Sequence, residues 1–233
     1  MKKLTYITLF AFLWTLSAQA DFTLNLTDSY TQDNNVSGSG DGVADGALNQ
    51  SGYEQYIGAA AGGGQERKAF FNVELPSVDS QTLLALTSGS NIDTATLRVY
   101  YGGDNGTPTD NLSLFYDTKG SINTVAADMF SSDYDDTGLG ILQGATSGAY
   151  VEFDVTSLIQ GAYNESNNIA SFRFEVDGNI LLGQGAAVYK LRGAGADANM
   201  IPQLFLATVP EPSTAALLAG CFALASVMIR RRR

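Results

Sequence analysis

The sequence contains no histidine, and its single cysteine and single tryptophan stand near the two ends of the chain, at Cys221 and Trp14. The absence of histidine excludes Ser-His-Asp catalysis and nearly all zinc and copper sites. Because residues 21–208 contain no cysteine, they can form no disulfide, no cysteine nucleophile and no thiolate metal site. We therefore expect a domain that is held together by an ordinary hydrophobic core and is not an enzyme.

Basic residues are also scarce between the two ends of the chain. Six of the 13 basic residues are Lys2, Lys3 and Arg230 to Arg233, which leaves seven in 21–208 against 23 of the 24 acidic residues. The net charge of this region is therefore near −16. Phosphate binding needs a basic surface, so nucleic acid is excluded as a partner. The acidity indicates a well-solvated exterior that can also attract divalent cations.

The first twenty residues have the pattern of a secretory signal peptide. Met1-Lys2-Lys3 supplies the positive end, residues 4–16 are mostly apolar, and Ala18-Gln19-Ala20 is a small-x-small cleavage triplet. We expect the Sec machinery to export the chain, with cleavage after Ala20 and before Asp21. The alternative is an uncleaved anchor, which the short apolar stretch disfavours.

The last 25 residues combine a proline motif, an apolar run and a basic terminus. The motif is Val209, Pro210, Glu211 and Pro212; the apolar run is 213–229; the basic terminus is Arg230, Arg231, Arg232 and Arg233. The run of 17 residues gives about 25 Å of helix, the lower limit for a membrane span, and the arginines would stay on the cytoplasmic side.

This order of motif, apolar helix and arginines resembles the PEP-CTERM sorting tail. The resemblance implies that residues 209–233 are a sorting tail with a transmembrane helix, which enters the inner membrane transiently and is processed by an exosortase. It also implies delivery to the cell surface or extracellular matrix, and to a biofilm, of a Gram-negative bacterium.

Residues 21–208 alternate between apolar and polar side chains in several short runs separated by Gly-, Asn-, Asp- and Ser-rich turns. One apolar side per strand is typical of antiparallel sheets. We therefore predict an all-β domain, an antiparallel β-sandwich or jelly roll. The alternating runs are 22–26, 71–75, 95–101, 112–116, 151–155, 172–176, 187–191 and 203–207.

Four segments of this region resemble DNRLRE-type domains. They are Arg67–Pro76, Ala95–Tyr101, Val151–Thr156 and Met200–Leu206, and they occur in the family's order. The resemblance implies a jelly-roll-like β-sandwich of the kind that is often attached to secreted enzymes as a carbohydrate-binding module. It supports a fold more than a function.

Tyrosines are the candidate ligand-binding residues. Tyr100 lies on the side of its run opposite to the apolar residues, and Tyr53, Tyr56 and Tyr134 lie in or near expected loops. Tyrosine can stack on a sugar ring and bind through its hydroxyl. We therefore take these four residues as candidates for binding exopolysaccharide.

Carboxylates offer a second candidate site. Asp133, Asp135 and Asp136 lie close together beside Gly138, and their oxygens could bind calcium, although the alternative of a solvated loop is open. No other cofactor is expected. Asp154, just before Thr156, has a structural interpretation: its carboxylate accepts backbone N–H bonds where a short helix begins.

Three functions remain open on the sequence. The first is a non-catalytic surface or matrix protein, for which an acidic domain and a sorting tail are enough. The second is a carbohydrate-binding module acting on exopolysaccharide, which requires exposed tyrosines on one surface. The third is a glycan-active enzyme, which requires two carboxylates in one cleft.

Overall fold

A computed structural model describes most of the central region of the chain. The described residues are 20–26, 28–34, 47–48, 53–59, 66–78, 86, 88–105, 110–117, 133–142, 144–176, 187–208 and 220–221. Their strands are β1 (Ala20–Asn25), β2 (Asp28–Asn34), β3 (Ala47–Leu48), β4 (Glu54–Ala59), β5 (Glu66–Glu74), β6 (Ile92–Asn105), β7 (Leu112–Asp117), β8 (Tyr134–Ile141), β9 (Ala149–Asp154), β10 (Ile169–Val176), β11 (Ala187–Arg192) and β12 (Gln203–Thr208). The helices are the short 3-10 helix η1 (Gly89–Asn91) and α2 (Thr156–Asn164).

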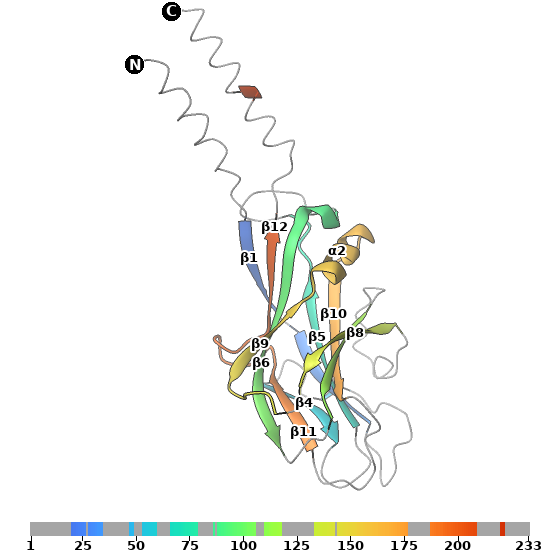
Figure 1. Cartoon of the computed structure of the whole chain (residues 1–233), viewed down its shortest axis with the longest axis vertical. Helices are drawn as coiled ribbons and strands as arrows, with labels where there is room; N and C mark the ends of the chain where they lie inside the picture. The colour runs from blue at the N-terminus through green and yellow to red at the C-terminus, as the bar shows by residue number, and fades with distance from the viewer. Residues whose placement is uncertain are drawn as a thin grey trace, which may run out of the picture.

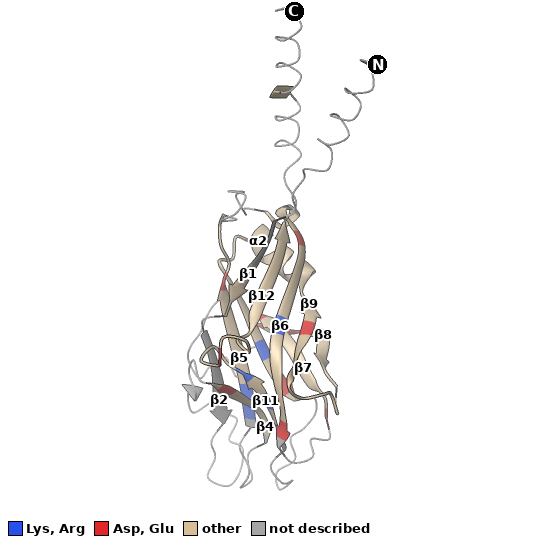
Figure 2. Cartoon of the chain, turned by 90° about the vertical axis from the view of Figure 1, so that its left-hand side faces the viewer, with Lys and Arg blue, Asp and Glu red and all other residues tan. Residues whose placement is uncertain are grey.

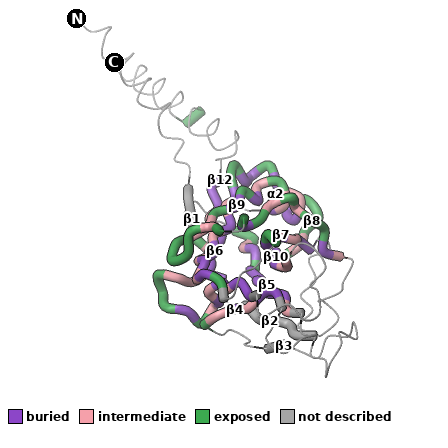
Figure 3. The backbone as a smooth tube through the Cα atoms, turned by 60° about the horizontal axis from the view of Figure 1, so that its bottom comes forward, coloured by how far each residue is buried: buried purple, intermediate pink, exposed green. Residues whose placement is uncertain are grey.

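All pairs of neighbouring strands are antiparallel, which confirms the predicted antiparallel β class. The main path through the sheet is β1-β12-β6-β11-β4-β5-β10-β7-β8, with β9 beside β6, β2 beside β5 and β3 beside β2. Hydrogen bonding is therefore continuous, where a sandwich would have two separate sheets. The sheet curls around a common core (Figure 3).

Strand β6 is the longest and organises one half of the sheet. Its first part, 92–98, pairs with β12 and its last part, 101–105, pairs with β11. On its other edge, 96–101 pairs with β9. Alternate residues of β6 point to opposite sides, so the apolar side chains of this strand enter the core while the polar ones between them point outward. The buried set is Ala95, Leu97, Val99 and Tyr101.

The core joins the two halves of the curled sheet. The rings of Phe153 on β9 and Phe174 on β10 meet with centroids 5.8 Å apart, although these strands lie far apart along the sheet. Helix α2 covers one end of this core with three buried side chains, Ile159, Ala162 and Tyr163. Aromatic pairs of this kind stabilise a core beyond the area that they bury.

The predicted short helix after β9 is present, and the predicted role of Asp154 is confirmed. One carboxylate oxygen of Asp154 accepts hydrogen bonds from the Thr156 backbone N–H at 3.0 Å and from the Thr156 hydroxyl at 2.6 Å. Thr156 Oγ1 also accepts the backbone N–H of Ala95 on β6 at 2.9 Å. These bonds fix the helix to the strand that it covers.

The two ends of the central region lie side by side. Strand β1 pairs with β12 so that Ala20 stands opposite Thr208, and both lie at the end of the sheet near α2 (Figure 1). Within the described part of the chain, no helix is long and apolar enough to span a membrane. The expected signal peptide and the expected transmembrane helix at 213–229 fall outside the described residues, apart from Ala20 and the helical pair Gly220 and Cys221.

Candidate ligand-binding surface

An arginine stands at the centre of the outward side of β6, β9 and β12. Arg98 points outward because its neighbours Leu97 and Val99 point into the core. Its guanidinium carbon lies 4.2 Å from the ring centroid of Tyr150 on β9 and 5.5 Å from that of Phe205 on β12. Its Nε lies 3.0 Å from a carboxylate oxygen of Glu152. The arginine thus bridges aromatic side chains from the strands on both of its sides.

Two tyrosines extend this group along the sheet. Tyr100 and Tyr150 are directly opposite each other on β6 and β9, and their rings pack edge to face with centroids 5.3 Å apart. The Tyr100 hydroxyl donates to the carbonyl of Gly148 at 2.8 Å, and the Tyr150 hydroxyl donates to that of Ile201 at 3.1 Å. Burial raises the pKa of Tyr150, although the nearby Arg98 opposes this shift. Both rings are therefore held in place while remaining partly exposed.

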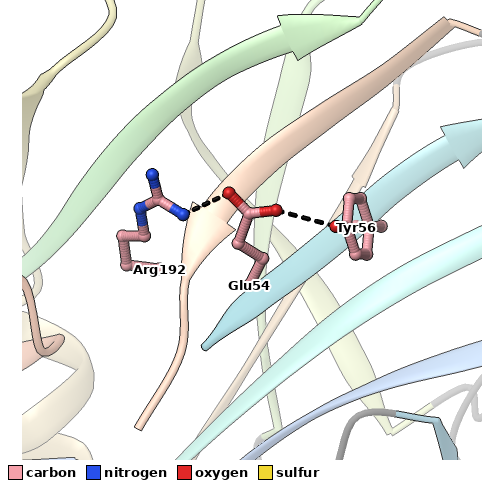
Figure 4. Close-up of polar contacts among 3 residues, drawn as sticks. All are labelled: Glu54, Tyr56 and Arg192. Atoms are coloured by element: carbon pink, nitrogen blue, oxygen red, sulfur yellow. Dashed lines mark hydrogen bonds and ion pairs between the residues drawn. The ribbon is translucent and has the colours of Figure 1, made fainter. Parts of the chain in front are cut away.

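A second group of polar and aromatic side chains lies on β4 and β11 (Figure 4). Glu54 accepts the hydroxyl hydrogen bond of Tyr56 at 2.7 Å and forms an ion pair with Arg192. The hydrogen bond to Glu54, together with partial burial, raises the pKa of Tyr56. The Arg192 guanidinium also lies 4.4 Å from the ring centroid of Tyr53, which is 43% exposed.

Glycine at position 102 brings the two groups together. Gly102 follows Tyr100 by two residues and so points to the same side of β6. A Cβ placed on Gly102 would lie 3.5 Å from the guanidinium of Arg192, so this arginine reaches across β6. Lys190 stands opposite Tyr56 on β4 and opposite Gly103 on β6.

The two groups together form one surface, which we call the aromatic face. Figure 2 views the molecule from this side and shows basic residues on β6 and β11. The aromatic face consists of Tyr53, Glu54, Tyr56, Arg98, Tyr100, Tyr150, Glu152, Lys190, Arg192 and Phe205.

The comparison with known families concerns the tail, which follows β12 directly. Residues 208–233 match the PEP-CTERM protein-sorting motif. The PEP-CTERM motif implies an exported protein that is processed by an exosortase and associated with the cell surface of a Gram-negative bacterium. The match does not extend to the domain that the PEP-CTERM tail follows. No curated protein matches the chain. The comparisons lend no support to the resemblance between this domain and DNRLRE-type domains.

Three of the four tyrosines expected to bind glycan share the aromatic face, namely Tyr53, Tyr56 and Tyr100. The expectation that Tyr134 is exposed is wrong, although it does lie next to a turn, as the first residue of β8 after Asp133. Tyr134 lies on β8 and is only 7% exposed, because the outward side of β5, β10 and β7 is covered as well. Its ring packs edge to face on that of Phe70 with centroids 5.9 Å apart.

Two aromatic members of the face were missed in the sequence, although their signal was present. Tyr150 precedes the apolar set of β9 in the alternating phase that points outward, and Phe205 alternates with Leu204 and Leu206 on β12. Tyr150 and Phe205 are both aromatic residues at a polar position of an alternating run, and this pattern predicts an exposed aromatic side chain.

The polar groups around Tyr134 form a buried network on the outward side of β5, β10 and β7, in the other half of the curled sheet. The Tyr134 hydroxyl donates to Ser171 Oγ at 2.6 Å, and Ser171 Oγ donates to Asn72 Oδ1 at 2.5 Å. The Arg173 guanidinium lies 4.6 Å from the Tyr134 ring centroid and its Nε lies 3.4 Å from Glu175. Because its members are buried and bond to one another, this network is structural.

The three aspartates expected to bind calcium do not converge. Asp133 lies in a turn, and Asp135 and Asp136 are exposed successive residues of β8, which point to opposite sides of a strand. One Asp136 oxygen accepts the backbone N–H of Gly138 at 2.9 Å. Among the residues that the structure describes, no group of three or more acidic side chains is placed to hold a metal ion.

Proposed function

We propose that the domain over residues 21–208 is a non-catalytic glycan-binding module, which attaches this PEP-CTERM protein to exopolysaccharide at the cell surface or in the extracellular matrix. The observation that supports the proposal is the aromatic face. It gathers five partly exposed aromatic rings and a set of charged side chains on one side of a sheet.

The chemistry of the face suits sugars. A sugar ring has apolar C–H surfaces that can lie against Tyr and Phe rings, and hydroxyls that need both donors and acceptors. Arg98, Lys190 and Arg192 supply donors, and Glu54 and Glu152 supply acceptors. Ion pairs and ring contacts already hold both arginines, so little side-chain freedom is lost when a ligand binds.

The shape of the face favours an extended polysaccharide over a small ligand. The stretch of β6 from Arg98 to Gly103 alone is about 17 Å long, since an antiparallel strand rises roughly 3.4 Å per residue. The adjoining strands widen the surface on both sides of β6. A sheet surface of this length can contact several sugar units of one chain.

Charge also distinguishes this face from the rest of the domain. Glu152 and Glu54 pair with Arg98 and Arg192, and Lys190 has no ion pair among the described residues. The face carries three basic and two acidic side chains, so it repels an acidic polysaccharide less than the domain's net charge near −16 alone would imply. The panel of glycans used to test binding should therefore include both neutral sugars and uronates.

The arrangement of carboxylates supports the non-catalytic part of the proposal. Glycoside hydrolysis needs two carboxyl groups that flank one scissile bond. On the aromatic face, Glu54 is held by Arg192 and Tyr56, while Glu152 is held by Arg98 in the other group. Each carboxylate is thus directed at an arginine of its own group.

The test is binding of the mature protein to the exopolysaccharide of the producing organism and to a glycan panel, with calcium and with EDTA. We expect saturable binding that weakens at least about fivefold in Tyr100→Ala, because stacking of a ligand ring on an aromatic side chain contributes on the order of 1–3 kcal/mol. Tyr150→Ala should behave alike. Equal binding with calcium and EDTA would leave the aspartates of β8 without a role in the interaction.

Two controls make the result specific to the face. Tyr100→Phe keeps the ring and should bind nearly as the wild type, and Val78→Ala changes an exposed apolar residue away from the face. Binding that is unaffected by loss of both rings would overturn the assignment to this surface. No binding to any glycan would leave a non-catalytic matrix protein without a glycan ligand.

A further inference from the structure

The ladder between β1 and β12 joins the two points at which the domain is expected to be processed. Ala20, the last residue of the expected signal peptide, stands directly opposite Thr208, where the match to the sorting motif begins. Thr208 is 1% exposed and also stands opposite Ile92 on β6. The sorting motif therefore starts inside the sheet, with no spacer between them.

The distance from the sheet to the motif is correspondingly short. Pro210 and Pro212 lack the backbone N–H that a ladder needs, so β12 cannot be extended through the motif. Pro212 is the fourth residue after Thr208, and an extended chain of four residues reaches at most about 14 Å. A protease that cuts in the motif must therefore work close to the end of the domain.

That end of the domain is tightly packed. A Cβ on Gly89 would lie 2.3 Å from the carbonyl oxygen of Gln160, so η1 and α2 are in direct backbone contact. Asn164 Oδ1 accepts the Gly89 N–H at 2.9 Å, and the Gln160 side-chain amide donates to the carbonyl of Ile92 at 2.9 Å. Helix α2 thus fastens the start of β6, against which Thr208 rests.

We propose that the exosortase cleaves the tail of the folded domain with the β1–β12 ladder intact, and that the end formed by Asp21, Thr208, η1 and α2 faces the membrane. Strand β12 lies between β1 and β6, so opening it would break ladders on both sides and expose Leu204 and Leu206. Cleavage beyond Thr208 needs no such opening. This proposal does not depend on glycan binding.

The orientation places the aromatic face away from the lipid surface. Counted along β6 from Ile92, Arg98 lies about 20 Å and Gly103 about 36 Å from the membrane-facing end. In this orientation the face is free to meet polysaccharide while the tail is still in the inner membrane.

The first test locks the ladder in the full-length chain in the producing organism. The side chains of Asn25 and Gln203 are opposite each other and 3.0 Å apart at their nearest atoms, so the double variant Asn25→Cys/Gln203→Cys can form a disulfide in the oxidising periplasm. We expect the locked precursor to be converted to the mature form at the wild-type rate. The two single variants are the controls. Precursor that accumulates when locked, and is released by a reducing agent, would overturn the proposal.

A second variant covers the case in which the lock does not close. Gly89→Ala introduces a clash with α2 and loosens the end on which Thr208 rests. If cleavage acts on the intact ladder, this loosening should not speed conversion of precursor to mature protein. Faster conversion in Gly89→Ala than in wild type would show that β12 must open first, and would overturn the proposal.

The orientation is tested with the full-length chain, carrying Cys221→Ala, in vesicles that contain a lipid-borne fluorescence quencher. A fluorophore is attached to Ser90→Cys at the membrane-facing end, or to Asp104→Cys about 40 Å further along β6; both positions are exposed. We expect strong quenching at position 90 and little at position 104. Equal quenching at both positions, or the reverse order, would refute the orientation.

Discussion

Asp154 shows how one residue can connect a strand to a helix. Its carboxylate accepts two hydrogen bonds from Thr156, one from the hydroxyl and one from the backbone N–H, and these bonds lower the pKa of Asp154 below its ordinary value. A carboxylate that is held this way favours the folded state only while it is ionised.

Replacing the Asp154 carboxylate should therefore reduce the loss of folding stability that occurs as the pH falls. Because the pKa is lower in the folded state, the stabilisation is present above the unfolded-state pKa of about 3.9 and disappears as the pH falls through the folded-state value. We expect Asp154→Asn to lose part of the difference in melting temperature between pH 7 and pH 3. Glu74→Gln, an exposed change on β5, is the control and should keep the wild-type difference.

Ser171 is the centre of the buried network on the outward side of β5, β10 and β7. Ser171→Ala would remove the hydroxyl that bonds to the Tyr134 hydroxyl and to Asn72, both of which are buried. Removing a buried hydrogen-bond partner costs about 1–3 kcal/mol. Urea unfolding should show a loss of stability of this size, whereas the exposed Ser157→Ala on α2 should change stability little. Equal stability of the two variants would mean that the network contributes nothing.

At the scale of elements, the strands that could be predicted are those with one apolar side. All eight alternating runs coincide with strands of the structure. Strands β2, β3, β4 and β8 were missed. Strand β3 has only two residues, and the other three, Asp28–Asn34, Glu54–Ala59 and Tyr134–Ile141, are mostly polar or contain glycine. Strand β8 is the last strand on the main path of the sheet. Its backbone hydrogen bonds are made with β7, and this pairing does not need an apolar side on β8.

Two glycines offer a matched test of how η1 meets α2. Gly89→Ala would place a methyl group against the backbone of Gln160, and overpacking of this kind costs about 1–3 kcal/mol. Gly161→Ala, within α2, would place its methyl group in open space and should stabilise the helix by up to about 1 kcal/mol. Thermal unfolding of the two variants should therefore shift in opposite directions, and a shift in the same direction would contradict this account of the contact.

At the scale of the whole molecule, the sequence predicted the fold class and the sorting tail better than it predicted the binding surface. Alternation places a tyrosine on the outward side of a strand, but it does not show which strands become neighbours. Tyr100 and Tyr53 come together only because β11 pairs with both β4 and β6. For the same reason, alternation could not predict that the outward side of β5, β10 and β7 is covered and that Tyr134 is buried there.

Buried tyrosines should control how the molecule unfolds in alkali. Burial raises the pKa of Tyr101 to about 12 and raises those of Tyr116 and Tyr163 as well. A raised folded-state pKa gives stability that is complete below the unfolded-state value of about 10 and is lost as the pH rises towards 12.

Because residues 21–208 contain no tryptophan, the ionisation of the tyrosines can be followed directly by the absorbance of tyrosinate. We expect exposed tyrosines to titrate reversibly near pH 10, and the buried ones to titrate only as circular dichroism shows loss of the sheet. Titration of all tyrosines in a single step with the sheet intact would contradict the burial described for these three.

The pairing of β1 with β12 also sets the order of events as the chain emerges from the export channel. The strand that leaves first can pair only with the strand that leaves last, and contacts of such long sequence separation form slowly. Until Thr208 has crossed, β1 has no partner and β6 has one edge open along 92–98. The emerging chain must therefore be kept from pairing with other chains until its final strand arrives, a few residues ahead of the apolar run 213–229 that is expected to enter the membrane.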